Sequence, residues 1–296
     1  MNSGFYLALC AYAFWGLIPL YWKQLPPIGA FETLTMRILW GLPFVLLWVL
    51  GSGKWSELKN IFRSRKALGW LLITTLLISI NWYTFVWAVF NNHLIESAMG
   101  YYINPLFNVF LGTVLLKEKL RNRQWIAVAL ACAGVLILGV GEWQRSFIAL
   151  GLASTFALYG LCRKKAALSA QVGVSFELGA LFFPALIGFF YLDSMGQTFF
   201  NHYSFGNQLN IAMAGPITIF PLVLFSFSVT KLKLSTMGII QYVTPTLHFL
   251  IGHLIYGEPL DSHRVYAFAF IWPAVIIYLI DEISYQRTKR AAATSH

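Results

Sequence analysis

Polar side chains recur at helical spacing inside apolar stretches of this sequence, and they are the residues best suited to bind a small molecule. One stripe has strict four-residue spacing and holds a carboxylate and two amides: Glu96, Gly100, Asn104, Asn108 and Gly112. Residues four apart lie on one face of a helix. Because carboxylates and amides are costly to bury against apolar groups, this face should point into a polar interior.

Two further stretches carry a comparable polar face. One contains Gly238, Gln241, Pro245, His248 and Gly252, and the other contains Asn81, Thr84, Trp87 and Asn91. We interpret the three faces as the lining of one cavity, in which amides orient a solute and aromatic rings stack on it. The candidate binding residues are Tyr12, Trp15, Asn81, Trp87, Tyr101, Asn104, Asn108, Gln241, Tyr242, Thr244 and His248. The alternative interpretation is that the amides only join helices to one another by hydrogen bonds.

The composition indicates which solvent surrounds these helices. The 296 residues are 58% hydrophobic and 11% charged, whereas charged residues make up about 25% of soluble domains. So few charges exclude a soluble or disordered chain, and we expect the lipid bilayer to be the surrounding medium. The three cysteines, Cys10, Cys132 and Cys162, lie in apolar stretches without C-x-x-C spacing. They therefore predict neither a disulfide framework nor a metal site.

Apolar stretches long enough to cross a bilayer, at about 20 residues each, set the number of helices. Ten such ranges are expected, at roughly 3–22, 29–50, 67–90, 94–116, 124–141, 147–162, 172–192, 208–229, 234–256 and 265–283.

The charges in the loops test this count and set the orientation. Seventeen of the 21 lysines and arginines follow the second, fourth, sixth or eighth range or lie at the C-terminus. Since such residues stay on the cytoplasmic side, both termini are expected in the cytoplasm. This asymmetry accounts for the net charge of +10 without a nucleic-acid partner, and anionic lipid headgroups suit the basic loops.

An internal repeat with an offset of 140 residues relates the two halves of the chain. The matched pairs are Tyr102 with Tyr242, Pro105 with Pro245, Gly112 with Gly252, Glu118 with Glu258 and Leu120 with Leu260. Each half has five spans, an odd number, so the second copy is inverted in the membrane. Inverted repeats are typical of secondary transporters that bind substrate near the midplane. Pro105 and Pro245 are predicted helix kinks at matching positions of the two halves.

Ionisable residues inside the spans are few, and each needs a partner because a lone charge in a bilayer is costly. We expect Arg37 to pair with Glu96 as an outer gate. Glu177 would pair with Arg163, Lys164 or Lys165 as an inner gate. His248 titrates near neutral pH and is a candidate for proton coupling.

The sequence lacks the motifs of the enzymes and pumps that act in membranes. It contains no H-E-x-x-H, G-x-S-x-G or Walker-type G-x-x-x-x-G-K-[ST] pattern, so we interpret the chain as a non-enzyme that needs no metal or organic cofactor.

The joint pattern of both halves resembles a known family. In the first half the matching residues are Asn81-Trp82, Trp87-Ala88-Val89, Asn91-Asn92-His93, Glu96, Gly100-Tyr101, Ile103-Asn104-Pro105-Leu106, Leu111-Gly112, Glu118 and Gln124-Trp125. In the second half they are Tyr159-Gly160-Leu161, Arg163-Lys164, Leu234-Ser235-Thr236, Gln241-Tyr242, Pro245-Thr246 and Tyr256-Gly257-Glu258. The pattern resembles the RarD group of EamA-type transporters in the drug/metabolite transporter superfamily. The resemblance implies ten helices in two EamA-type repeats, residence in a bacterial inner membrane, a permease working in export, and a chloramphenicol-related phenotype.

We therefore expect an all-α membrane protein of ten transmembrane helices with the EamA fold. Two inverted five-helix repeats would occupy residues 1–141 and 147–283, and a basic cytoplasmic tail would occupy residues 284–296. A small metabolite or drug-like solute would bind at the midplane, with alternating access from the two sides. The alternatives are a sensor or scaffold with the same fold and a filled cavity, or a channel. Proton exchange, substrate exchange and facilitated diffusion are all compatible with these residues, as are a monomer and a dimer.

Overall fold

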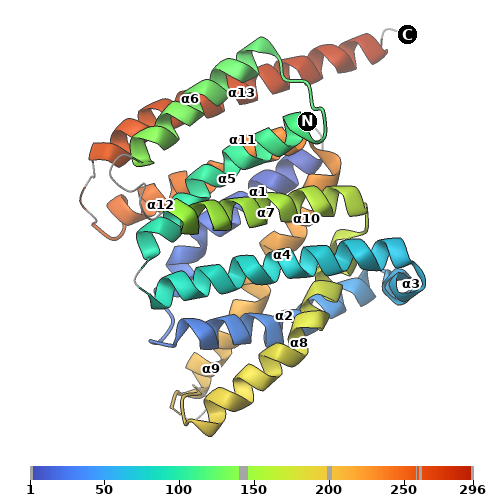
Figure 1. Ribbon diagram of the computed structural model, residues 1–296, viewed down its shortest axis with the longest axis vertical. Coiled ribbons are helices and arrows are strands. Elements are labelled where there is room, and N and C mark those ends of the chain that lie inside the picture. The colour runs from blue at the N-terminus through green and yellow to red at the C-terminus, as the bar shows by residue number, and fades with distance from the viewer. Residues whose placement is uncertain are drawn as a thin grey trace.

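The structure, a computed structural model, describes residues 3–91, 93–139, 146–198, 202–257, 259 and 262–294. Every regular element in this part of the chain is helical (Figure 1). The elements are α1 (Ser3–Trp22), α2 (Ala30–Gly51), α3 (Trp55–Asn60), η1 (Ile61–Arg63), α4 (Arg65–Phe90), α5 (Leu94–Val114), α6 (Asn122–Gly139), α7 (Ser146–Ala166), α8 (Ala170–Ser194), α9 (Phe205–Ala212), α10 (Ala214–Lys231), α11 (Leu234–Gln241), α12 (Val243–Leu254) and α13 (Ser262–Thr294).

Seven helical segments are long and apolar enough to cross a membrane by length and composition, counted over the described residues. They are α1, α2, α4, α6, α8, α13 and the segment Phe205–Lys231 that joins α9 to α10. The prediction of a multi-pass membrane protein is confirmed. The remaining expected ranges are also helical, in α5, α7 and the pair α11 and α12. Helix α5 carries the polar stripe, and α7 ends in three basic residues. The last range is divided between α11 and α12.

Two of the expected ranges are broken, and proline explains where. Helix α9 ends at Ala212 and α11 ends at Gln241, in each case four residues before a proline, Pro216 or Pro245. A proline inside a helix has no N–H to donate and its ring collides with the carbonyl four residues back. Each proline instead lies in the first turn of the following helix, where a missing donor costs nothing. By contrast, α5 continues past Pro105 as one helix.

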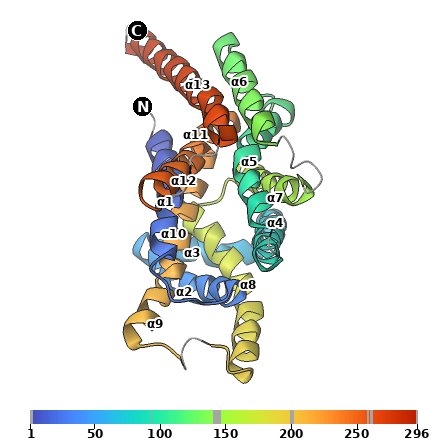
Figure 2. The same ribbon diagram turned by 90° about the vertical axis from the view of Figure 1, so that its left-hand side faces the viewer.

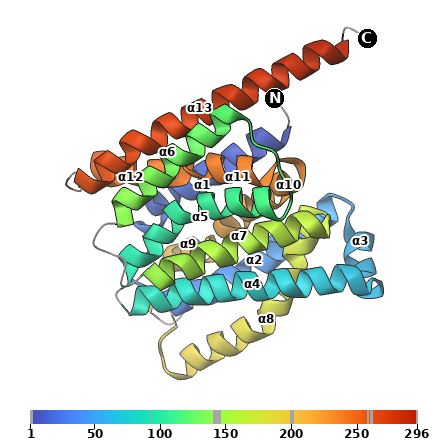
Figure 3. The same cartoon turned by 45° about the horizontal axis from the view of Figure 1, so that its top comes forward.

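The helices form two rows with a pair at each end, which Figure 2 shows most clearly. One row contains α12, α1 and α10, and the other contains α5, α7 and α4. At one end α6 lies along α13, as Figure 3 also shows, and at the other end α2 packs against α8. Helix α11 crosses between the rows and packs against α5.

The main apolar core lies between the two rows. It includes Ala11 and Tyr12 of α1, Tyr159 of α7 and Phe225 of α10, all at most 1% exposed. Alanine and glycine allow the helices to approach closely, which is the usual basis of packing between helices in a membrane. The cavity described below lies next to this core.

The short helix α3 is attached to the N-terminus of α8 through one carboxylate. Glu57 accepts hydrogen bonds from the backbone N–H of Ser169 (3.1 Å) and from its hydroxyl (2.7 Å), and Lys54 lies 3.4 Å away. Partial burial raises the pKa of Glu57, but these hydrogen bonds and Lys54 outweigh it, so its pKa lies below the usual value.

Replacing Glu57 by glutamine should destabilise the protein slightly at neutral pH. A carboxyl whose pKa is lowered by folding stabilises the folded state above its unfolded pKa, and this contribution is lost as the pH falls through the folded pKa. We expect about 1 kcal/mol or less at pH 7, because the group is partly exposed and screened. The difference from wild type should shrink in acid. Thermal unfolding in detergent at pH 7 and pH 4 measures this, and a difference that is constant with pH would contradict it.

Candidate functional site in a central cavity

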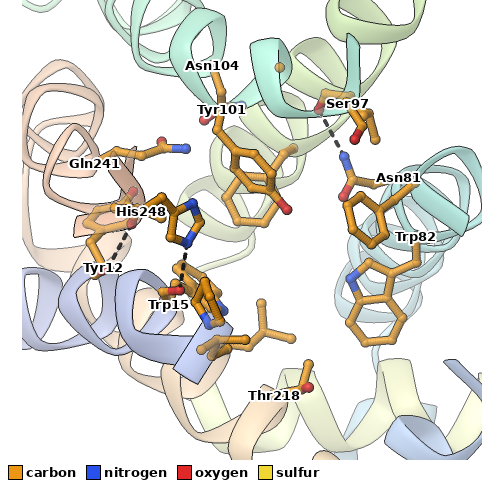
Figure 4. A pocket seen from close by; sticks show the side chains of 18 of the residues that line it. Tyr12, Trp15, Asn81, Trp82, Ser97, Tyr101, Asn104, Thr218, Gln241 and His248 are labelled. Carbon is orange, nitrogen blue, oxygen red and sulfur yellow. Dashed lines mark hydrogen bonds between the residues drawn. The ribbon is translucent and has the colours of Figure 1, made fainter. Parts of the chain in front are cut away.

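A cavity of about 320 Å³ lies between the two rows of helices (Figure 4). Its lining comes from α1, α2, α4, α5, α7, α10, α11 and α12. The lining residues are Tyr12, Trp15, Ile18, Pro19, Trp22, Arg37, Asn81, Trp82, Phe85, Ser97, Gly100, Tyr101, Asn104, Leu152, Phe156, Thr218, Leu222, Gln241, Thr244 and His248.

The polar faces expected from the sequence meet here in part, because Thr84, Trp87 and Asn91 of the third stretch lie outside the lining. Eight of the eleven candidate binding residues line the cavity: Tyr12, Trp15, Asn81, Tyr101, Asn104, Gln241, Thr244 and His248. The other three lie outside the lining. Asn108 is buried beneath it, the Tyr242 hydroxyl donates to the carbonyl of Tyr102 (3.3 Å), and Trp87 stacks on His93. The role of these residues in binding stays a prediction.

Several of the lining polar groups are already used to join helices, as the alternative interpretation expected. The side-chain amide of Asn81 donates to the carbonyl of Leu152 (2.9 Å), and that of Asn104 donates to the carbonyl of Ala153 (2.6 Å). The Thr244 hydroxyl donates to the carbonyl of Tyr12 (2.7 Å). His248 Nε2 lies 3.2 Å from the carbonyl of Trp15, which fixes the proton on that nitrogen when the ring is neutral.

Two polar groups remain directed at the open space. In Figure 4 the amide of Gln241 and the ring of Tyr101 extend toward the middle of the cavity. Gln241 Oε1 accepts from Asn108 (3.2 Å), and Asn108 also donates to Asn104 (3.1 Å). Among the described residues, neither Gln241 Nε2 nor the Tyr101 hydroxyl has a hydrogen-bond partner. Both groups can therefore donate a hydrogen bond to a bound molecule.

The cavity is closed on one side by a cluster that we call the aromatic floor: Tyr12, Trp15, Phe156, Tyr159 and Phe225. Phe225 is its centre, with ring centroids 5.2 Å from Phe156, 5.9 Å from Trp15, 6.1 Å from Tyr159 and 6.2 Å from Tyr12. Only 1% of Phe225 is exposed. Because ring packing at these distances leaves no room for water, a solute cannot pass this layer without a rearrangement.

A buried ion pair lies beyond the floor. Arg163 Nη1 is 3.6 Å from Glu177 Oε1, and each residue is 2% exposed. Tyr159 donates to Glu177 Oε2 (2.9 Å), and Arg163 Nη2 donates to the carbonyl of Ala170 (3.0 Å). Of the three basic candidates for pairing with Glu177, Arg163 is the partner. Lys164 instead donates to the carbonyls of Val229 and Leu232, and Lys165 is exposed.

The expected outer pair is not formed in this conformation, which corrects the sequence analysis. No ion pair joins Arg37 to Glu96 in the part of the chain that the structure describes. Glu96 Oε1 lies 3.1 Å from His93 Nδ1, one helical turn away. The guanidinium of Arg37 lies 4.4 Å from the centre of the Trp22 ring, where cation–π attraction replaces an ion pair.

Helices α5 and α11 cross very closely beside the cavity, at Pro105 and Gly238. A Cβ placed on Gly238 would lie 2.5 Å from the Pro105 carbonyl oxygen and 2.9 Å from Asn108 Cβ. Position 238 therefore has no room for a side chain, and only glycine fits there.

Replacing Gly238 by alanine should destabilise the protein by about 1–3 kcal/mol, because the added methyl group forces two packed backbones apart. Thermal or denaturant unfolding in detergent measures the change. The matched control is Gly151→Ala in α7, where nothing lies within 4 Å of an added Cβ; a better helix former there should be neutral or slightly stabilising. Equal stability of the two variants would contradict the close crossing.

Sequence reasoning missed the apolar part of the lining, including Trp22, Trp82, Phe85 and Phe156. Their positions fall outside the spacing of the polar faces, and aromatic residues in a membrane protein equally occur at the lipid interface. Only the repeat could have indicated them, since Phe85 and Phe225 are 140 residues apart, the offset of the matched pairs.

The chain is similar to known transporters over nearly its whole length. Residues 2–140 match the EamA-like transporter family. Protein RarD of Escherichia coli is 39% identical over 97% of each chain. A transporter of Pseudomonas aeruginosa is 43% identical over 95% of this chain and 94% of its own. The chloramphenicol-sensitive protein RarD of the same species is 30% identical over 93% of each chain.

A solved crystal structure shares the fold, with a TM-score of 0.71 over 94% of this chain and 97% of the other, at 15% identity. The family resemblance expected from the sequence is thus confirmed. The chain belongs to the EamA-like transporter family and, within it, to the group of RarD proteins.

Proposed function

We propose that this chain is a secondary-active permease that exports a small metabolite or drug-like solute by alternating access around the central cavity. The observation that carries the proposal is a cavity open between two rows of helices and sealed on one side by the aromatic floor. A scaffold would fill this space with apolar side chains, and a channel would continue through the floor. The chloramphenicol link rests on the name of one relative.

The pairing of the helices supports two inverted repeats, at residues 1–141 and 147–283. Exchanging α1 with α7, α2 with α8, α4 with α10, α5 with α11–α12 and α6 with α13 maps each main contact onto another. The contact of α1 with α10 becomes that of α7 with α4, and the contact of α1 with α12 becomes that of α7 with α5. The contacts α2–α8, α5–α11 and α6–α13 map onto themselves. Glu258 and Leu260, the repeat partners of Glu118 and Leu120, lie outside the described residues.

Both termini are proposed in the cytoplasm from the loop charges, and contacts between helix ends support the division of the segments between two sides of the membrane. On the proposed cytoplasmic side, Lys231 Nζ lies 3.4 Å from Ser3 Oγ and Lys233 donates to the carbonyl of Lys119 (3.0 Å). On the opposite side, Tyr21 donates to the carbonyl of Asn210 (2.6 Å) and Tyr256 to the carbonyl of Pro19 (3.0 Å). Each set joins only helix ends and loops that an even number of the expected spans separates, so both sets agree with ten crossings.

Proton coupling is the open part of the proposal, and His248 is its candidate. Because Nε2 donates to the carbonyl of Trp15, a proton that moves through this ring would be taken up and released at Nδ1. His248→Gln, with transport measured from pH 5.5 to 8, tests this, because an unchanged pH profile would remove the histidine from the coupling.

The deciding experiment measures uptake into proteoliposomes of labelled chloramphenicol, amino acids and aromatic metabolites, with and without a pH gradient. Asn104→Ala removes a lining amide, and we expect it to lower uptake of the carried solute at least about tenfold. Asn91→Ala is the matched control, since that amide is exposed at the end of α4 and donates to the carbonyl of Trp87. Folded protein that carries none of these solutes would favour a sensor or scaffold.

A further inference from the structure

The charged lining of the cavity is positive and has no negative side chain to balance it. Among its lining residues Arg37 is the single permanently charged side chain, and no aspartate, glutamate or lysine accompanies it. The lining is otherwise mostly aromatic and aliphatic, with a few amides and hydroxyls. An unbalanced cation in such surroundings is costly, and an anion that entered the cavity would be strongly attracted to it.

Arg37 is also incompletely satisfied as a donor. Its Nε is buried and has no hydrogen-bond partner. Its guanidinium lies against the face of Trp22, 4.4 Å from the ring centre, and its other electrostatic neighbours are the neutral side chains of Tyr101 and Tyr21. A guanidinium donates two parallel hydrogen bonds to a carboxylate, a geometry that a ring face cannot supply. A carboxylate bound here would therefore complete the coordination of Arg37.

The rest of the lining fits the body of an aromatic solute. Trp15, Trp82 and Phe156 offer ring faces and edges for stacking, and Gln241 and Tyr101 offer donors toward the same space (Figure 4). We propose that the cavity selects aromatic monocarboxylates, with the carboxylate on Arg37 and the ring between these aromatic side chains. This inference rests on the proposed function and names its substrate class.

The same inventory argues against amino acids as preferred substrates. An ammonium group would need a carboxylate partner, and the lining supplies none. The positive charge of Arg37 would also repel the ammonium group. The cavity should therefore favour a simple carboxylate over the zwitterion with the same ring. A cation should bind least of all.

Four probes with the same ring and chain length test the charge preference: 3-phenylpropanoate, 3-phenylpropanol, L-phenylalanine and 3-phenylpropylamine. Binding to the full chain in detergent is followed by tryptophan fluorescence at pH 7.5, and exchange is measured in proteoliposomes. We expect 3-phenylpropanoate to bind at least about tenfold more tightly than the other three. Arg37→Gln should remove that advantage while leaving the affinity for 3-phenylpropanol within about twofold, which also shows that the variant is folded.

The control is Lys23→Gln, which removes a cation that lies over the Tyr256 ring, 3.7 Å from its centroid, outside the lining. It should leave all four affinities unchanged. Equal binding of acid and alcohol, or equal losses of both in Arg37→Gln, would overturn the carboxylate assignment and leave the proposed function standing if either probe exchanges. Arg37-dependent binding of the acid without exchange of any probe would support the assignment and overturn transport.

Discussion

Replacing Arg163 by methionine should lower the free energy of unfolding by about 3–5 kcal/mol, the loss typical of removing one partner from a buried ion pair. Methionine fills much of the same volume, but it leaves Glu177 charged and 2% exposed, without its cationic partner. The hydrogen bond from Tyr159 to Glu177 would remain. The variant should also lose the bond from Arg163 to the Ala170 carbonyl, which joins the end of α7 to the start of α8.

The double variant Arg163→Met/Glu177→Gln separates the charge from the packing. Glutamine keeps an acceptor for Tyr159 but carries no charge, so the double variant should recover most of the loss, whereas additive effects would contradict coupling of the pair. Lys165→Met is the surface control on the same turn of α7 and should change stability by less than about 0.5 kcal/mol. Unfolding is measured in one detergent for wild type, Arg163→Met, Glu177→Gln, the double variant and Lys165→Met.

Much of the architecture could be predicted because a bilayer imposes simple rules. Helical periodicity gave the polar faces, and loop charges gave an even number of crossings. The helix breaks at Ala212 and Gln241 were less accessible. A proline disturbs the residue four positions earlier, and whether the chain breaks there, as before Pro245, or continues, as past Pro105, depends on the neighbouring helices.

The site was predictable where polar residues marked it and not where partners were chosen in three dimensions. Asn104 and Gln241 stand out because amides are rare at depth. The sequence offered Arg37 a carboxylate, Glu96, near the same face, but a nearer histidine pairs with Glu96 and a tryptophan lies against Arg37. Such competition is decided by side-chain reach across helices, which spacing along one helix does not encode.

Replacing Phe225 by alanine should open the sealed side of the cavity. Phe225 contacts the other four rings of the aromatic floor, so truncation leaves a void at the centre of this layer. Truncating a buried phenylalanine costs about 3–5 kcal/mol. Trp15 and Phe156 still meet across α1 and α7, with ring centroids 5.8 Å apart, but the space that the Phe225 ring filled stays empty. We expect the variant to conduct small solutes passively while losing concentrative transport.

Passive efflux of labelled glycine, a small solute that crosses lipid slowly, measures this from preloaded proteoliposomes. Efflux should rise several-fold in Phe225→Ala and stay at the wild-type rate in Phe183→Ala, whose ring lies on α8 and is 70% exposed. Phe225→Leu refills part of the void and should give an intermediate rate if the floor is a physical seal. Unchanged efflux in a folded, destabilised Phe225→Ala protein would mean that the barrier lies elsewhere, with the ion pair of Arg163 and Glu177 as the next layer to test. The aromatic floor and this ion pair lie on the same side of the cavity, so alternating access requires both layers to separate together. A leak caused by opening the floor alone would show that the two layers do not act as one unit.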